Sequence, residues 1–239
     1  MSAELWPLAG AALSIGCLHT LLGPDHYVPF VAMSRAGKWS TRKTLLITCL
    51  CGLGHVGSSI LLGLLGIALG LAVNRIEGIE ESRGGFAAWL LIGFGAAYLI
   101  WGIIYAVRGR THSHPHAHSD GTIHSHQHDH HAEHLHPHSE LQQVTPTRMT
   151  PWILFTIFFF GPCEPLVPLL MYPAAEASLW GVATVTVLFS VATLLTMTAM
   201  VTLLVGGFRL VRFSTFERFT HAFAGGLLLA CGMAVKLGL

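Results

Sequence analysis

The sequence predicts an all-α, polytopic membrane protein with six transmembrane helices in two related halves, and three observations lead to this prediction. Of the 239 residues, 52% are hydrophobic and only 10% are charged, with a mean hydropathy of +0.60, whereas soluble domains carry about 25% charged residues. Six apolar stretches are each long enough to cross the hydrocarbon core of a bilayer, which takes about 20 helical residues. A similar proline-containing motif occurs in the first and the fourth of them.

The spans fall into two groups of three, separated by one long polar segment. This segment divides the chain into a first three-helix repeat (1–107), a histidine-rich loop (108–150) and a second three-helix repeat (151–239). The predicted spans are residues 5–33, 44–73, 84–107, 151–174, 178–207 and 217–238.

The distribution of Lys and Arg predicts the orientation in the membrane, because cytoplasmic loops carry an excess of them. Ten of the 13 basic residues lie in the first, third and fifth loops, and only Arg75, Arg83 and Lys236 lie on the opposite side. We therefore expect a multi-pass protein of the cell (inner) membrane, with both termini outside and residues 108–150 in the cytoplasm. The net formal charge of +1 gives no indication of nucleic-acid binding.

The segments Gly23–Pro29 and Gly161–Pro168 both read Gly-Pro, then a polar pair, then Val-Pro. Because each half has three spans, two related halves must have opposite topology. Inverted repeats with broken helices at their interface are typical of transporters, and the breaks point to the binding site. The sequence therefore predicts two inverted three-helix repeats in which helices 1 and 4 are broken.

Proline lacks an N–H and clashes with the carbonyl four residues earlier. Pro24 and Pro162 should therefore free the carbonyls of Thr20 and Phe158. Free backbone groups at membrane depth are tolerated only where protein or a water-filled cavity satisfies them. We expect the two broken helices to line a cavity together.

The ionisable and thiol side chains near the breaks are candidate metal ligands, because such groups inside a membrane are costly and by default functional. Imidazole, carboxylate and thiolate suit Ni²⁺, Co²⁺ or Zn²⁺ better than Cu(I), which prefers Cys and Met, or Mg²⁺ and Ca²⁺, which prefer oxygen. Structural roles, as helix caps or packing residues, are the alternative for each residue. The candidates are His19, Asp25, His26, His55, Cys163 and Glu164.

The spacing of His19 and His26 bears on whether they share one ion. Seven residues of regular helix place two side chains on one face but about 10 Å apart along the axis. Both could bind a single ion only if Pro24 unwinds the segment between them. The sequence leaves this open.

Twelve of the 16 histidines lie in the loop between the halves, mostly at alternate positions among Ser, Pro, Ala, Gln and Asp. Such a tract cannot bury a core and should be disordered without metal, and its composition is typical of metal binding. A neutral linker is the alternative. The loop metal-binding candidates are His112, His114, His116, His118, His124, His126, His128, His130, His131, His134, His136 and His138.

At these residues the chain resembles the nickel/cobalt transporter superfamily, in particular its efflux-type and urease-accessory (UreH-like) membrane proteins, within the wider lysine-exporter-like group of 3 + 3 helix proteins. The resemblance depends on Cys17-Leu18-His19 with Gly23-Pro24-Asp25-His26, on Gly161-Pro162-Cys163-Glu164-Pro165, and on the histidine-rich loop. Five residues separate His19 from Asp25, where the permeases have four. Pro24-Asp25-His26 also stands where efflux-type members tend to have Pro-Gly-His.

Residues and resemblance together favour a transporter of divalent transition-metal ions, most of all Ni²⁺ or Co²⁺, with Zn²⁺ also compatible. The ion is expected near the midplane, as cargo, with no permanently bound cofactor and no enzymatic activity. The cytoplasmic loop would capture or buffer ions for export, or receive imported ions. A cytoplasmic metallochaperone is then a candidate partner, beside the lipid bilayer.

Two enzymatic alternatives remain. Thiol–disulfide electron carriers of the same superfamily have a cysteine after a proline in both repeats; Cys163 fits this position, but its repeat counterpart is Asp25. A membrane di-metal oxygenase also uses many histidines, but at fixed helical spacing rather than in one Ser- and Pro-containing loop.

Overall fold

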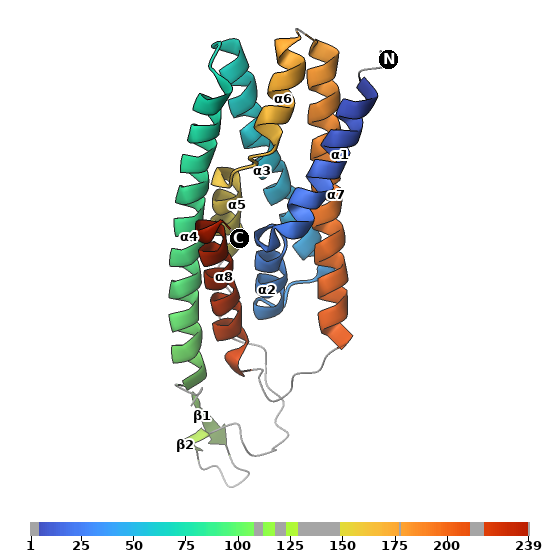
Figure 1. Cartoon of the computed structure of the whole chain (residues 1–239). Helices are drawn as coiled ribbons and strands as arrows, with labels where there is room; N and C mark the ends of the chain where they lie inside the picture. The colour runs from blue at the N-terminus through green and yellow to red at the C-terminus, as the bar shows by residue number, and fades with distance from the viewer. Residues whose placement is uncertain are drawn as a thin grey trace.

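The computed structural model describes residues 5–107, 112–117, 123–128, 149–176, 178–210 and 218–238. Within these ranges the chain forms an elongated bundle of α-helices, with two short strands beyond one end of it (Figure 1). In chain order the elements are α1 (Leu5–Leu22), the 3-10 turn η1 (Pro24–His26), α2 (Val28–Ala36), α3 (Thr41–Ala68), α4 (Val73–Val107), β1 (His112–Ala117), β2 (Ile123–His128), α5 (Thr150–Phe160), α6 (Leu166–Ala175), α7 (Leu179–Leu210) and α8 (Thr220–Leu237).

Four helices of the described chain are long and apolar enough to cross a membrane, namely α3, α4, Leu179–Gly207 of α7, and α8. The apolar helices α5, α6 and Trp6–Leu22 of α1 are shorter. Large apolar side chains face outward from the bundle: Leu61 on α3 and Leu203 on α7 are 67% and 69% exposed. Extensive exposed apolar surface marks a membrane or protein interface, and with four helices of this length it indicates a membrane protein.

The predicted breaks in the first and fourth apolar stretches are present, about midway along the bundle (Figure 1). The first runs from Gly23 to Tyr27, where Gly23 is extended and η1 replaces the α-helix. The second begins at Gly161, also extended, and α6 starts only at Leu166. Prolines at 24 and 162 explain both breaks, because each lacks the N–H that would continue the preceding helix.

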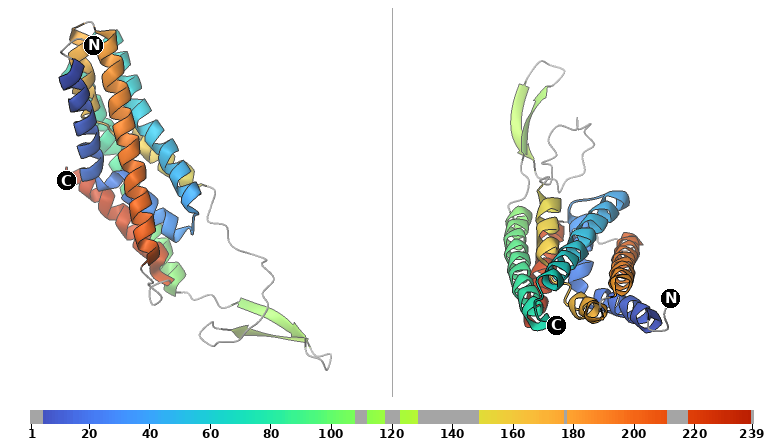
Figure 2. Two further views of the ribbon diagram at one scale, coloured as in Figure 1. Left: turned by 90° about the vertical axis from the view of Figure 1, so that its right-hand side faces the viewer. Right: turned by 90° about the horizontal axis from the view of Figure 1, so that it is seen from above.

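The packing brings the two halves of the chain into close contact (Figure 2). Helix α1 packs on α7, α2 on α8, α4 on α8, and α3 on α5, α6 and α7. One core cluster contains Phe30 and Phe158, and a second contains Cys163 and Phe189. Because Phe158 and Cys163 flank the second break, the break lies where the two clusters meet.

Glycines allow α4 and α8 to approach closely. A Cβ atom at Gly102 would collide with the backbone of Ala222, and one at Gly225 would collide with the backbone of Leu99. Small residues at helix contacts are the usual means of close packing in membranes, where burial of apolar surface gives no net drive. This contact fixes α4 beside the second half of the chain.

The structure corrects the predicted limits of the second and third spans. Helix α3 ends at Ala68, where Gly70 takes a left-handed conformation (φ +64°) and starts the turn. Helix α4 begins at Val73 rather than at residue 84, so residues 74–83 are helical and not a loop. Glu80 and Arg83, one helical turn apart, form an ion pair within this extension, so its polar residues are compatible with a helix that continues the apolar span.

Part of the histidine-rich segment has regular structure, which the sequence analysis did not predict. β1 and β2 pair antiparallel, with His112 opposite His128 and His116 opposite His124. Alternate placing of one residue type has the two-residue period of a strand, which agrees with this pairing.

Candidate metal centre

Three histidines from two separate parts of the chain meet at the first break. His19 lies in the last turn of α1, His26 in η1, and His55 in the middle of α3. The ring centroid of His26 is 4.7 Å from that of His19 and 5.1 Å from that of His55. The unwound segment therefore removes the separation of about 10 Å that a regular helix would impose between His19 and His26.

The hydrogen bonds of His26 define which of its nitrogens can bind a metal. Its Nδ1 lies 3.1 Å from the carbonyl oxygen of Gly23 and 3.2 Å from Oδ1 of Asp25. Since a carbonyl can only accept, Nδ1 carries the proton, and Nε2 of the neutral ring is left with a free lone pair. A carboxylate behind a histidine is the usual means of orienting a metal ligand and raising its basicity.

His55 is oriented in the same way by the second break. Its Nδ1 donates to the carbonyl of Phe158 at 3.3 Å, the carbonyl that Pro162 was expected to free. Gly161 lies against the ring, because a Cβ atom there would stand 3.2 Å from Nδ1 of His55. The break in the fourth apolar stretch therefore positions a ligand on α3, and Nε2 of His55 is again the free nitrogen.

The free nitrogens are buried. Within the described chain, Nε2 of His19, His26 and His55 has no hydrogen-bond partner, although each atom is inaccessible to solvent. Buried polar atoms are normally satisfied, so three unsatisfied nitrogens at one place need an explanation. A cation held by His19 and His55, which belong to one group of possible metal ligands, would explain why their nitrogens lack a partner.

The thiol of Cys163 completes a donor set. Donor atoms of His19, His55 and Cys163 all lie within 4.8 Å of one another. Tetrahedral coordination with bonds of about 2.0–2.3 Å needs donors about 3.3–3.8 Å apart, so small side-chain movements would close the site. The sulfur comes from the second broken helix and the imidazoles from the first broken helix and α3.

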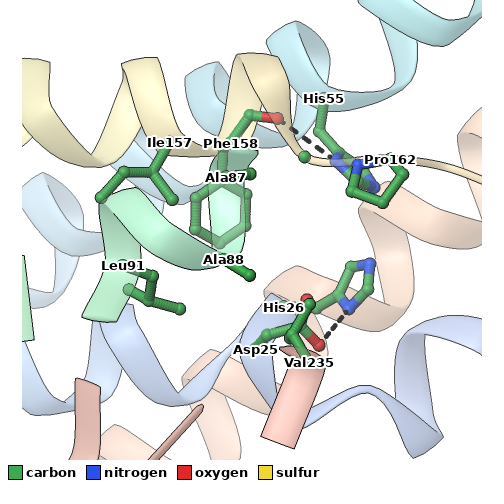
Figure 3. A pocket seen from close by; sticks show the side chains of 11 residues that line it. Asp25, His26, His55, Ala87, Ala88, Leu91, Ile157, Phe158, Pro162 and Val235 are labelled. Carbon is green, nitrogen blue, oxygen red and sulfur yellow. Dashed lines mark hydrogen bonds and ion pairs between the residues drawn. The ribbon is translucent and has the colours of Figure 1, made fainter. Parts of the chain in front are cut away.

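A small cavity is lined by His26 and His55, as Figure 3 shows. Its volume is about 30 Å³, which is room for a water molecule or an ion. Asp25 and His26 line it from the first break, and Gly161 and Pro162 from the second. The expectation that the two broken helices share a cavity is confirmed.

Glu164 lies elsewhere. It is exposed and lines a separate cleft with Asn74, Glu77, Glu80 and Glu81, whereas Cys163, the preceding residue, is buried beside His19 and His55. The turn after Pro162 sends the two consecutive side chains in different directions. The structure therefore brings together His19, Asp25, His26, His55 and Cys163 of the expected set, and separates Glu164 from them.

Arg83 belongs to the surroundings of the site, although the sequence analysis treated it only as a basic loop residue. Its guanidinium donates to Oε1 of Glu80 at 2.8 Å, to the hydroxyl of Ser58 at 2.7 Å and to the carbonyl of Phe159 at 2.8 Å. Arg83 thus ties α4 to α3 and to the end of α5, one residue from the carbonyl that orients His55. The spacing of Glu80 and Arg83 at i and i+3 is typical of an ion pair on one helix face, and this pattern in the sequence could have indicated that the residues are helical.

The loop candidates are only partly within the described chain. His112, His114, His116, His124, His126 and His128 belong to β1 and β2. His118, His130, His131, His134, His136 and His138 lie outside the described residues.

The fold and the site together define a membrane protein with a buried histidine–cysteine cluster at two helix breaks. Comparison with protein-family models, with curated proteins and with solved structures gave no match for this chain.

Proposed function

We propose that the chain is a transporter of divalent transition-metal ions, with Ni²⁺ and Co²⁺ as the preferred cargo and Zn²⁺ also accepted. The observation that carries the proposal is the buried group of His19, His55 and Cys163, whose donor atoms lie within 4.8 Å of one another at two helix breaks. Imidazole and thiolate together favour borderline divalent ions. Asp25, held against His26, would offset part of the charge of the ion.

The proposal includes six membrane crossings in two inverted repeats. α1 with α2, and α5 with α6, would each cross as one broken span, beside the four longer helices. The packing supports this, because exchange of the halves turns the α1–α7 contact into the α5–α3 contact and leaves α4–α8 unchanged. Access to the site would then alternate as the two halves rock against each other.

In the proposed orientation the histidine-rich loop is cytoplasmic and both termini lie outside the inner membrane. In Figure 1 the α2–α3 connection lies at the same end of the bundle as β1 and β2, and the α3–α4 and α6–α7 connections lie at the other end. This agrees with the distribution of Lys and Arg. The loop would hold ions, or pass them to a metallochaperone, at the cytoplasmic mouth.

The test uses purified full-length protein in liposomes with a panel of metals, with and without a proton gradient. We expect flux of Co²⁺ and Ni²⁺ that falls about tenfold or more in His55→Ala and in Cys163→Ser, since each loses a ligand. His221→Ala and Cys51→Ser are the matched controls, because both residues lie outside the cluster. Equal flux in wild type and in both ligand variants would contradict the proposal.

Binding itself gives a second readout. A cysteine with an ordinary pKa of about 8.5 is protonated at pH 7, but binds metal as the thiolate. Calorimetric Co²⁺ titrations in two buffers of different ionisation enthalpy should therefore show about one proton fewer released by Cys163→Ser than by wild type. If Cys163→Ser and wild type release the same number of protons on Co²⁺ binding, Cys163 is not a metal ligand.

A further inference from the structure

Two hollows lie at successive levels of α4. The first is a cleft of about 490 Å³, lined by Glu164 and by Asn74, Glu77, Gly78, Glu80 and Glu81 in the first turns of α4. The second is the small cavity of His26 and His55, which Ala87, Ala88 and Leu91 line from a later part of the same helix. Because a helix rises about 1.5 Å per residue, the middle of the cleft and the middle of the cavity are about 15 Å apart along α4.

Arg83 lies between these two levels and contacts three helices at once. Its guanidinium donates to Oε1 of Glu80 on α4 at 2.8 Å, to the hydroxyl of Ser58 on α3 at 2.7 Å and to the carbonyl of Phe159 near the end of α5 at 2.8 Å. The hydroxyl of Ser58 in turn donates to the carbonyl of His55 at 2.9 Å. Arg83 thus joins the helix that carries His55 to the segment that leads into the second break.

Glu80 extends this contact to the second break itself. Its side chain is fully buried although it lines the cleft, and it contacts Ser59 on α3 and the backbone of Cys163. Cys163 is fully buried and belongs to the group of possible metal ligands. Glu80 therefore lies between the cleft and the thiol of Cys163.

The contact between α4 and the second break is close immediately after the ion pair. Gly84 follows Arg83 in the chain, and a Cβ atom on Gly84 would stand 2.6 Å from Cγ of Pro162. Pro162 also lines the small cavity. A polar layer of Glu80 and Arg83, backed by this contact, thus separates the cleft from the cavity along α4.

The charge of Arg83 opposes the passage of a metal ion at this level. A guanidinium is always protonated, and like charges repel strongly where the surroundings are poor in water. In the structure Glu80 balances this charge. A divalent ion could therefore pass between the cleft and the cavity only after the side chain of Arg83 has moved aside.

We propose that Glu80 and Arg83 form a gate that closes the histidine–cysteine cluster toward the end of the bundle at which α3 connects to α4. The gate opens when Arg83 releases Ser58 and the carbonyl of Phe159. This release also frees the segment whose preceding carbonyl, that of Phe158, holds His55, so opening of the gate weakens the hold on a ligand. The role of the gate in transport rests on the proposed function, whereas the closure does not.

The reactivity of Cys163 tests the closure without any metal. Purified full-length protein in detergent is treated with a water-soluble maleimide, and the alkylation rate of each cysteine is followed by mass spectrometry of its peptide. The variants are Arg83→Ala and Glu80→Ala/Arg83→Ala, since the second leaves no buried carboxylate without its partner. Arg75→Ala is the matched control, an exposed arginine in the first turn of α4 that does not line the cleft. Cys51, buried in the other core cluster, is the internal control for loss of fold.

We expect Cys163 to react about tenfold or more faster in both gate variants than in wild type, because reaction of a buried group requires local opening. Cys51 should react at its wild-type rate in every variant, and Cys163 should do so in Arg75→Ala. Protection of Cys163 that persists in the double variant would overturn the inference. Equal acceleration at Cys51 and Cys163 would also overturn it, because Glu80 and Arg83 would then support the fold as a whole.

Co²⁺ flux in liposomes separates the gate from the proposed function. The double variant should lower this flux several-fold, because access to the cluster cannot alternate if one side stays open. Selective exposure of Cys163 in the variants of a protein that moves no metal would support the closure and contradict the transport proposal. Co²⁺ flux in wild type, with Cys163 equally protected in all variants, would contradict the gate and leave the transport proposal in place.

Discussion

At the scale of single residues, the site depends on what lies behind its ligands. Asp25 and the carbonyl of Gly23 hold Nδ1 of His26, and the carbonyl of Phe158 holds Nδ1 of His55. The carbonyl of Gly23 directly precedes Pro24, and the carbonyl of Phe158 lies in the last turn of α5, four residues before Pro162. The breaks therefore do more than interrupt a span: they hold the Nδ1 atoms of two imidazoles and leave both Nε2 atoms without a hydrogen-bond partner.

Asp25→Asn tests this arrangement with almost no change of shape. The amide oxygen can still accept from Nδ1 of His26, but the negative charge is lost. We expect Co²⁺ affinity to fall about 10- to 100-fold, the usual effect of losing a residue that orients a ligand, and thermal stability to change little. Co²⁺ titration of the purified protein in detergent, followed by visible absorption, is the measurement. Wild-type affinity in Asp25→Asn would mean that the carboxylate does not act on the metal.

At the scale of elements, the contact between α4 and α8 places the second half of the chain against the first. Gly225 faces the backbone of Leu99 with no room for a Cβ atom, whereas a Cβ atom on its neighbour Gly226 would meet nothing within 4 Å. A side chain can therefore be added at Gly226 but not at Gly225, so substitutions at these two adjacent glycines serve as test and control.

Gly225→Ala should destabilise the protein, and Gly226→Ala should not. The first must push α8 away from α4, which costs about 1–3 kcal/mol as overpacking does. The second gains up to about 1 kcal/mol from helix propensity. Thermal unfolding in detergent measures both, and equal transition temperatures would contradict the packing of α8 on α4.

The elements also show what could be predicted from the sequence. Prolines and glycines act locally, so both breaks could be predicted from residues close in the chain, whereas the meeting of His19 and His26 was left open until the structure showed how far Pro24 unwinds the helix. The position of Glu164 depends on the path of the turn after Pro162, and the role of Arg83 depends on contacts with α3 and α5. Neither depends on a local sequence pattern, so the separation of Glu164 from the cluster could not be predicted. For the same reason, the start of α4 was predicted at residue 84 instead of Val73.

At the scale of the whole molecule, the histidine-rich strands and the buried histidine–cysteine cluster lie at different levels of the bundle. Strands β1 and β2 lie beyond one end of the bundle (Figure 1), and the buried cluster lies at the two helix breaks. Their side-chain chemistry differs: imidazole alone in the strands, and imidazole with thiol in the cluster. In the proposed function, selectivity would reside in the buried cluster, and the histidine-rich loop would set how many ions are near it.

Exchange of the twelve loop histidines for serine tests this division. The bundle should keep its unfolding temperature, because the described core clusters lie within the helical bundle. One tight Co²⁺ site should remain, while weak Ni²⁺ capacity in equilibrium dialysis falls by about four to six ions per chain at two or three imidazoles for each ion. His55→Ala should show the reverse pattern, with the tight site lost and the weak capacity retained. If the serine variant lost the tight site as well, the loop would be part of the selective centre, and the separation of capture from selection would be wrong.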